Sequence, residues 1–320
     1  MKPFDLNGYL SRSRAVDVSD VRWDDVPRYP LPAAARRTLR YMQDIEGHTI
    51  MYLRELLSTR AVDDPEVSTF LACWIYEETF HGRVLERFLT AAGESVSPRR
   101  RSDVGWTVRL QSVGTAIVSK AWPEFVAVHM TWGAINELTT LVGYQRLAAL
   151  ADHPVLSDLL ERIIRDESRH FMFYYQQAQR RLAQPGVARV VRALVDRFWA
   201  PVGSGVQPSA ETRFIAAYLL GGGDGRRAAR KIDATIQRLP GFGDVRLLEA
   251  WVDRHTDAAA PAAMAQPAEQ PAEERIPTCR AGRSIFPTWA TDMSRSAQTI
   301  FRDPPRPGSW RDAAASGSAR

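Results

Sequence analysis

The chain has 320 residues, of which 45% are hydrophobic and 25% are charged, and its formal net charge is +5. A chain of this length and composition can bury a full core, either in one large domain or in two small ones. The positive excess is too small to indicate a nucleic-acid partner, although arginines at 36–37 and 99–101 could meet an acidic protein instead of forming an ordinary solvated face.

Residues 1–31 show weak periodicity and contain Gly8, Pro27 and Pro30, so we expect them to be irregular. The first 14 residues lack the apolar run of a secretory signal, and no run approaches the ~18 apolar residues of a membrane-spanning helix. Only two cysteines are present, Cys73 and Cys279, which argues against a disulfide framework. These features predict a cytoplasmic protein without a transmembrane segment.

Helical apolar spacing predicts two long helices in the first hundred residues. The first spans about 32–60, and its apolar face contains one carboxylate, Glu46, which needs a partner there. We expect this face to comprise Met42, Glu46, Thr49, Ile50, Leu53 and Leu57. The second helix begins at Asp64 and Pro65, a capping acid followed by proline at the first helical position, and it ends near residue 93.

A basic loop at 97–102 and a further helix over 106–120 separate these helices from a second long pair. Pro123 begins a helix that runs to about residue 151 and carries Glu137. The next helix spans about 154–183, and its residues Leu159, Ile163, Glu167, His170 and Tyr174 are spaced by threes and fours.

Shorter helices are expected at 187–199, 210–220, 226–238 and 245–255, and no sustained strand-type alternation appears, so the sequence predicts an all-α fold. From residue 257 the composition shifts to Ala, Pro, Gln, Ser and Arg, which cannot bury enough apolar area to fold alone. We therefore expect one domain over 1–256 and a disordered tail over 257–320.

Two of the long helices contain the motif Glu-x-x-His, as Glu78 with His81 and Glu167 with His170. Residues three apart share a helical face, so each motif directs a carboxylate and an imidazole toward one point. Two such helices, with one further Glu from each of two others, build the di-iron site of ferritin-like four-helix bundles. Glu46 and Glu137 stand where those further carboxylates are needed.

The spacing supports one shared level in the bundle. Glu46 and Glu78 are 32 residues apart, and Glu137 and Glu167 are 30 apart, which suits a long helix plus a short return loop. Glu46, Glu78 and His81 would then hold one side, and Glu137, Glu167 and His170 the other, with carboxylates bridging. Mixed carboxylate and imidazole ligation suits two Fe ions, with Mn as a competitor, whereas zinc sites more often contain Cys or a tighter His cluster.

Each of these residues also has a structural explanation. Glu46 and Glu137 would be surface residues if the helical phases differed, Glu78 could pair with an arginine, and the two histidines could be satisfied core residues. The position of all six on apolar stripes favours the metal site.

The residues around these motifs resemble those of the soluble acyl-[acyl-carrier-protein] desaturases, a branch of the ferritin-like superfamily. Residues 74–82 resemble the W-x-x-E-E-x-x-H-G run of that family, and residues 166–170 resemble its D-E-x-R-H. Tyr52 follows Glu46 by six residues, as a tyrosine follows the first ligand in that family. The resemblance covers roughly residues 23–255.

The resemblance implies further roles. Thr140, one turn after Glu137, would assist oxygen activation; alternatively its hydroxyl bonds back to the helix backbone. Asp166 would accept a hydrogen bond from a ligand histidine. Trp23 would connect to the metal through Asp166 as an electron path; alternatively it is a core aromatic. Phe80 departs from the family, which often has Arg there, and the tail at 257–320 is not part of the pattern.

The implied function is a di-iron, O₂-dependent desaturase that introduces a double bond into an acyl chain carried on acyl carrier protein. A ferredoxin-like electron donor and a homodimeric assembly are the expected partners. Gly133 and Ala134, beside Trp132, could line an acyl tunnel, or they could serve ordinary helix packing. Two other functions stay open: a di-iron oxygenase acting on another substrate, and a ferritin-like iron- or ligand-binding protein without turnover.

Overall fold

A computed structural model describes residues 3–94, 122–204 and 207–256. Within these ranges the chain is all-α and contains no β-strand, which confirms the predicted fold class; an isolated bridge pairs Ser204 with Gln207. No described helix is long and apolar enough to cross a membrane. The predicted basic loop at 97–102, the helix over 106–120 and the tail lie outside the described residues, and the division of the chain at 256 stays a prediction.

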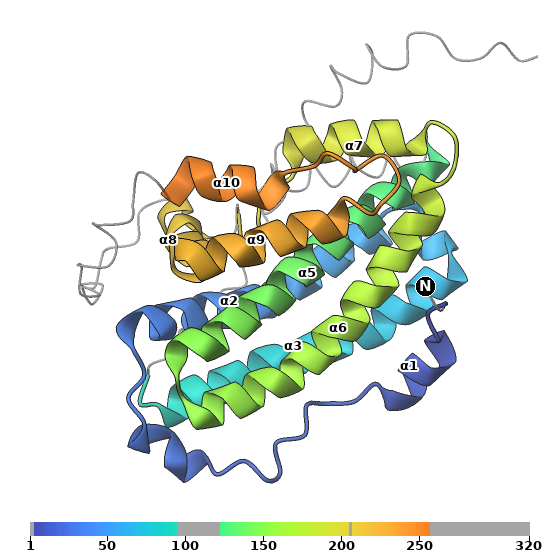
Figure 1. Ribbon diagram of the computed structural model, residues 1–320. Coiled ribbons are helices and arrows are strands. Elements are labelled where there is room, and N and C mark those ends of the chain that lie inside the picture. The colour runs from blue at the N-terminus through green and yellow to red at the C-terminus, as the bar shows by residue number, and fades with distance from the viewer. Residues whose placement is uncertain (1–2, 95–121, 205–206, 257–320) are drawn as a thin grey trace, which may run out of the picture.

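Four long helices form a bundle (Figure 1). They are α2 (Ala33–Leu57), α3 (Pro65–Ala91), α5 (Val126–Ala151) and α6 (Pro154–Leu182). α2 packs along α3, and α5 packs along α6, while contacts of α3 with α6 and of α2 with α5 close the bundle. This arrangement is consistent with a ferritin-like helical bundle.

The ends of these helices follow local chemistry. Asp64 caps α3, because its side chain accepts the backbone N–H groups of Glu66 and Val67 at 3.0 and 3.1 Å. His153 caps α6 by accepting from the N–H of Leu156 at 3.2 Å. Asp152 adopts the left-handed φ of 47° that ends α5. The connection between α5 and α6 is therefore only two residues long, which holds Glu137 and Glu167 at one level.

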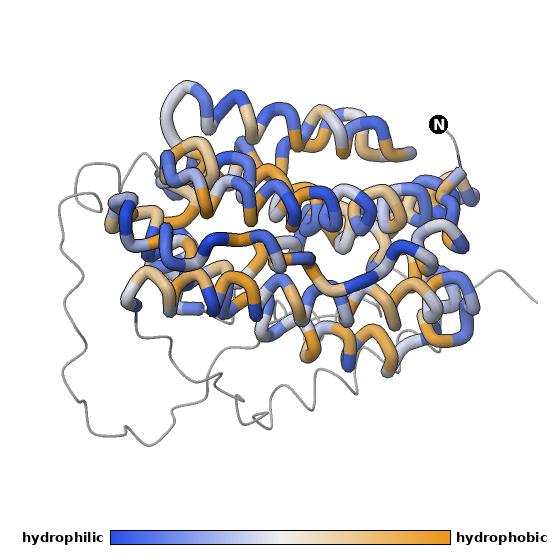
Figure 2. Tube along the Cα trace, turned by 90° about the horizontal axis from the view of Figure 1, so that it is seen from below, coloured by the Kyte–Doolittle hydropathy of each residue, from blue (hydrophilic) through white to orange (hydrophobic). Residues whose placement is uncertain are grey.

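A second layer covers α5. It consists of α7 (Val187–Phe198), α8 (Ser209–Leu220), α9 (Gly222–Ile236) and α10 (Leu247–Thr256). The first three of these helices contact α5, and α10 packs on α8 and α9. Every residue from 125 to 135 is therefore buried. Figure 2 shows that hydrophobic and hydrophilic residues alternate within short distances along the helices of the molecule.

The weak periodicity of the N-terminal region predicts an irregular segment, but the structure contains two short helices there. They are α1 (Leu6–Arg12) and a 3-10 helix, η1 (Trp23–Arg28). The side chain of Asp5 caps α1 by accepting from the N–H of Gly8 at 2.9 Å. Tyr9 is the one buried residue of α1, so this short helix offers almost no periodic signal. Two further 3-10 turns, η2 (Arg60–Asp63) and η3 (Pro123–Phe125), precede α3 and α5.

Two details of the predicted helices are wrong. Ile50 and Leu57 are 55% and 43% exposed, because the buried stripe of α2 follows Leu39, Met42, Glu46, Leu53 and Leu56 and passes beside them. α9 begins at Gly222, four residues before the predicted start, because its first turn uses glycines that favour a loop in isolation. Gly225 is required there, since a Cβ at this position would lie 2.3 Å from the carbonyl carbon of Leu220.

Candidate metal centre

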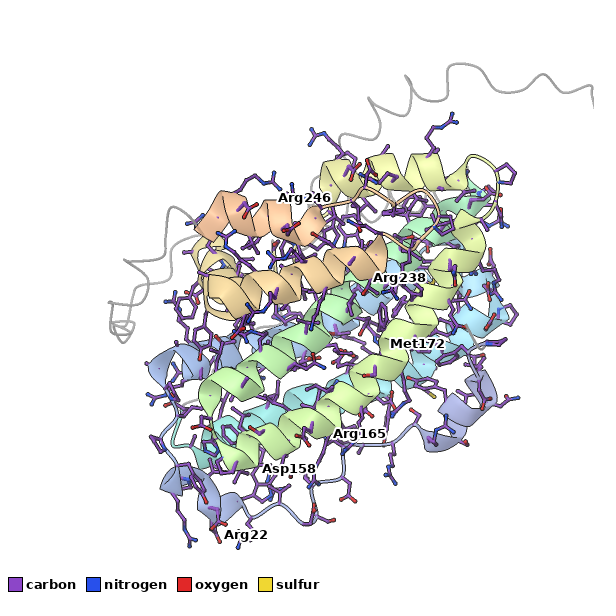
Figure 3. All side chains as sticks on the ribbon, in the orientation of Figure 1. Arg22, Asp158, Arg165, Met172, Arg238 and Arg246 are labelled. Carbon is purple, nitrogen blue, oxygen red and sulfur yellow. The ribbon has the colours of Figure 1, made fainter. Side chains whose placement is uncertain are left out.

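Six predicted side chains converge inside the bundle. Glu46 comes from α2, Glu78 and His81 from α3, Glu137 from α5, and Glu167 and His170 from α6. None of them is more than 7% exposed. The opposite side of α6 carries Asp158, Arg165 and Met172 at seven-residue intervals (Figure 3). The ligands Glu167 and His170 therefore lie on the side of α6 that faces the bundle interior, and these three residues lie on its outer side.

The six residues form two overlapping groups of potential ligands. Glu46, Glu78, His81 and Glu167 can bring one ligand atom each within 4.8 Å of one another, and so can Glu78, Glu137, Glu167 and His170. Glu78 and Glu167 belong to both groups, so both glutamates would be available to two ions if a pair were held here. The remaining four residues would then bind the two ions in pairs, Glu46 and His81 at one ion and Glu137 and His170 at the other.

The imidazoles face the carboxylates of the opposite motif more closely than their own. His81 Nδ1 lies 3.3 Å from Glu167 Oε1 but 3.9 Å from Glu78 Oε1. His170 Nδ1 lies 3.0 Å from Glu78 Oε1 but 3.7 Å from Glu167 Oε2. Each imidazole thus lies closer to the glutamate of the opposite motif, which sequence spacing alone did not indicate, and the assignment of the six ligands to two sides stays a prediction.

The donor set fits a pair of divalent cations. Among the described residues, five buried atoms of four side chains lack a partner in hydrogen-bond geometry, although some of them lie close together: Glu78 Oε1, His81 Nδ1, both carboxylate oxygens of Glu167 and His170 Nδ1. Unsatisfied buried polar atoms are costly and rare, and here they point at one another. Cations between them would satisfy all of these lone pairs at once. Carboxylate and imidazole together suit iron or manganese.

The electrostatics also favour added positive charge. Burial, followed by the nearby carboxylates of Glu78 and Glu167, raises the pKa of Glu46 well above its ordinary value. Burial likewise raises the pKa of Glu137 to about 8, with His170 opposing this effect. Burial would also raise the pKa of Glu167, but His170 and His81 outweigh it and lower this pKa. Without cations, four carboxylates share this interior with only two imidazoles.

Each histidine uses its other nitrogen to bind an outer carboxylate. His81 Nε2 lies 3.2 Å from Asp166 Oδ2, and His170 Nε2 lies 2.8 Å from Glu77 Oε2. A proton on each Nε2 leaves each Nδ1 free to bind a metal. Asp166 has the position required for its predicted role, whereas Glu77 was missed. The signal was present, because an acid immediately precedes the ligand glutamate in both motifs.

Aromatic donors hold the other two carboxylates. The hydroxyl of Tyr144 donates to Glu46 Oε1, and the indole Nε1 of Trp74 donates to Glu137 Oε1 at 3.1 Å. Each contact engages one oxygen and leaves the second oxygen of the carboxylate for the centre. Nothing in the sequence indicated Tyr144, because an apolar stripe does not distinguish a packing tyrosine from a hydrogen-bond donor.

An apolar cavity of about 210 Å³ adjoins the centre. Its wall includes Glu46, Glu78, Glu137 and Glu167, and it extends to α8 and α10, where Leu219, Leu248 and Trp251 line it. Trp132 and Gly133 also line it, but Ala134 does not. Gly133 additionally serves close packing, because a Cβ there would lie 2.4 Å from the ring of Tyr174.

Thr140 lines this cavity, and its hydroxyl makes no hydrogen bond within the described part of the chain. The hydroxyl of Thr139, in contrast, bonds back to the carbonyl of Ile135 at 2.7 Å. Trp23 is half-buried, and its ring lies 4.1 Å from the guanidinium carbon of Arg87. No hydrogen bond joins Trp23 to Asp166 in the described residues. The roles of Thr140, Asp166 and Trp23 stay predictions.

Comparison with known proteins identifies one relationship. Residues 48–197, a little less than half of the chain, match the family model described as fatty acid desaturase. The matched range begins two residues after Glu46 and contains the other five residues of the centre. It supports a fatty acid desaturase family and does not specify the carrier of the acyl chain. No curated protein and no solved structure matches this chain.

Proposed function

We propose that the protein is a di-iron, O₂-dependent desaturase that acts on an acyl chain carried on acyl carrier protein. The observation that carries this proposal is the position of the metal centre in the wall of an apolar cavity. A ferritin-like storage site needs the ligands but not such a cavity. The match to fatty acid desaturases supports the same reaction class.

Two iron ions would be held by Glu46, Glu78, His81, Glu137, Glu167 and His170, with Mn as the competing metal. When bound, the iron pair supplies the activation of O₂ that removal of hydrogen from an unactivated methylene requires. The protein fixes the six ligands, excludes bulk water and orients the substrate relative to them.

The cavity provides the orientation. Its wall is largely apolar, so an acyl chain gains free energy by leaving water there. Trp132, Gly133 and Thr140 bring one side of α5 to the cavity, beside Glu137. A chain lying along this wall passes the carboxylates that surround the centre. The methylene next to them would be the one that reacts.

Hydrogen bonds from a phenol and an indole would keep two ligands of the centre in place during the reaction. Tyr144 and Trp74 each engage one oxygen of Glu46 and Glu137, respectively, which would keep the orientation of these two carboxylates fixed. Thr140 lines the cavity and makes no hydrogen bond to another described residue, so its hydroxyl could donate a hydrogen bond or pass a proton beside Glu137. Electrons would come from a ferredoxin-like donor, for which Trp23 and Asp166 are the proposed path. A homodimer in the cytoplasm completes the proposal.

The test uses iron-loaded protein, a reduced ferredoxin, O₂ and a series of saturated acyl-carrier-protein substrates of different chain length. We expect a product that has lost two hydrogens, detected by mass spectrometry of the released acyl chain. Glu167→Ala is the matched inactive control. A product that has gained an oxygen would instead identify an oxygenase. Iron binding without any acyl product at any chain length would contradict the proposal.

A further inference from the structure

The two outer carboxylates of the metal centre are joined by one arginine. Arg169 Nη2 lies 3.0 Å from Glu77 Oε1 and 2.5 Å from Asp166 Oδ1. Glu77 is the hydrogen-bond partner of His170 Nε2, and Asp166 is the hydrogen-bond partner of His81 Nε2. Both imidazoles are therefore connected through a single guanidinium that is itself half-buried.

Tyr9 makes this network asymmetric. Its hydroxyl donates to Glu77 Oε2 at 2.7 Å, which is the same oxygen that lies 2.8 Å from His170 Nε2. Asp166 has no equivalent phenol, since its oxygens contact only His81 and Arg169 among the described residues. Glu77, Tyr9 and His170 are at most 1% exposed, so water does not replace a donor that is lost there.

The phenol is held by a helix that lies outside the four-helix bundle. α1 lies beside α3 (Figure 1), and its Tyr9 also contacts His170 and Arg169 of α6. The ring of Tyr9 lies 5.1 Å from that of Phe70, and Phe4 packs against Phe173 at 5.2 Å. The backbone N–H of Phe4 also donates to Gln176 Oε1 at 2.7 Å. These contacts fix both the position of α1 and the direction of the hydroxyl.

We propose that Tyr9 is a positioning residue of the metal centre, through which α1 fixes Glu77 and thereby the imidazole of His170. The inference rests on the proposed metal centre, although not on its substrate. Removal of the hydroxyl leaves Glu77 Oε2 with one donor instead of two, so that only Arg169 and His170 hold the carboxylate and its orientation is less fixed. The N–H of His170 then loses its fixed acceptor. The effect is expected at the ion bound by His170, because His81 is oriented by Asp166, which Tyr9 does not contact among the described residues.

The experiment is an anaerobic titration of the full chain with Co²⁺, followed by absorption spectroscopy and calorimetry. In Tyr9→Phe we expect one of the two ions to bind ~10–100-fold more weakly and its visible spectrum to change, as is typical when an acceptor behind a ligand histidine is disturbed. The other ion should bind as in the unmodified protein. Tyr175→Phe is the matched control. Like Tyr9, Tyr175 is a buried tyrosine, but it belongs to α6 and its hydroxyl donates to the carbonyl of Thr235 at 3.4 Å.

Reciprocity gives a second measurement that needs no variant. If docked α1 favours metal binding, metal binding must favour docked α1 by the same factor. Amide hydrogen exchange of residues 6–12 in the unmodified protein should therefore slow ~10–100-fold when two Co²⁺ ions are bound. This measurement decides the question even if Tyr9→Phe does not fold.

Any of three results would overturn the inference. Both ions could bind to Tyr9→Phe with unchanged affinity, or metal binding could be weakened equally in Tyr9→Phe and Tyr175→Phe. The third result is an amide hydrogen-exchange rate in α1 that does not change when metal binds. An unmodified chain that binds no pair of ions would overturn this inference and the proposed function together. A chain that binds two ions, shows the Tyr9 effect and forms no unsaturated product would overturn only the proposed function.

Discussion

Glu77 on α3 lies 2.8 Å from the imidazole Nε2 of His170 on α6, and the same relationship is repeated in the opposite direction between Asp166 on α6 and His81 on α3. Each motif helix therefore provides the outer acceptor for the histidine of the other helix. The exchange aligns the two helices at the level of the centre, because neither helix can slide without breaking both contacts.

Replacement of these acceptors should weaken metal binding at both histidines. We expect Glu77→Gln and Asp166→Asn each to lower iron affinity ~10–100-fold, because an amide is a weaker acceptor for the imidazole N–H than a carboxylate is. Iron per chain after gel filtration measures the effect. Glu161 is an exposed residue of α6, the helix that carries Asp166, and Glu161→Gln should retain the normal iron content. Full iron loading in both amide variants would refute this explanation of the acid that precedes each motif.

Loss of the Thr140 hydroxyl should affect turnover and not metal content. Thr140→Val removes a hydroxyl that faces the cavity, and we expect the rate of product formation to fall at least ~10-fold if this hydroxyl transfers a proton. Thr139→Val is the control, since the Thr139 hydroxyl is already bonded to the carbonyl of Ile135. Equal rates for the two variants, with equal iron content, would remove Thr140 from the mechanism.

His129 should make stability depend on pH. Burial lowers the pKa of His129 to about 4 from 6.5, so the unfolded chain binds a proton between these values while the folded chain does not. Stability therefore falls as the pH drops from 6.5 toward 4, by up to ~3 kcal/mol for this one group. Urea unfolding of the metal-free protein and of His129→Leu at pH 7 and pH 4.5 measures the difference. A pH dependence that is unchanged in His129→Leu would contradict the assignment.

Two glycines should respond in opposite ways to alanine. Gly133→Ala places a Cβ 2.4 Å from the ring of Tyr174, and we expect it to lower the free energy of unfolding by ~1–3 kcal/mol. Gly47 has nothing within 4 Å of the corresponding position, so Gly47→Ala should stabilise α2 by ~0.5–1 kcal/mol. Thermal or urea unfolding of the metal-free variants gives both values. Similar effects at the two sites would show that close packing does not explain Gly133.

Asp233 should stabilise α10 from outside that helix. Its two carboxylate oxygens accept the N–H groups of Leu248 and Glu249, both at 3.0 Å. An amide can accept only one of these, so Asp233→Asn should cost ~1 kcal/mol, the typical value of a lost helix cap. Denaturant midpoints provide the measurement. Asp244→Asn changes an exposed carboxylate on the preceding loop and should cost less, because its partner Arg192 also contacts Asp196.

The sequence was sufficient to predict the long helices, because their caps and apolar stripes are local. Asp64 with Pro65 determines where α3 begins, and the spacing of Glu137 and Glu167 determines the level of α5 relative to α6. Convergence of six polar residues followed from the same periodicity. The crossing of the two motifs did not, because which carboxylate an imidazole faces depends on helix rotation and not on spacing along one chain.

The contributions of Tyr9 and Tyr144 could not be predicted for a different reason. Tyr9 contacts a residue 68 positions away, from a helix whose only signal is a single cap. Tyr144 lies 98 positions from Glu46, and its place on the buried side of α5 does not distinguish a packing tyrosine from a hydrogen-bond donor. Glu77 is the exception among the residues that were missed, since comparison of the two motifs would have indicated it.

The layer formed by α8 and α10 has a consequence for how the cavity can be redesigned. These two helices line the cavity but contribute none of the six residues of the centre. Leu219, Leu248 and Trp251 can therefore be exchanged for larger or smaller side chains while the ligand geometry is conserved. Under the proposed function, selection for a new acyl-chain length would act on these helices, and the six ligands provided by the bundle would remain unchanged.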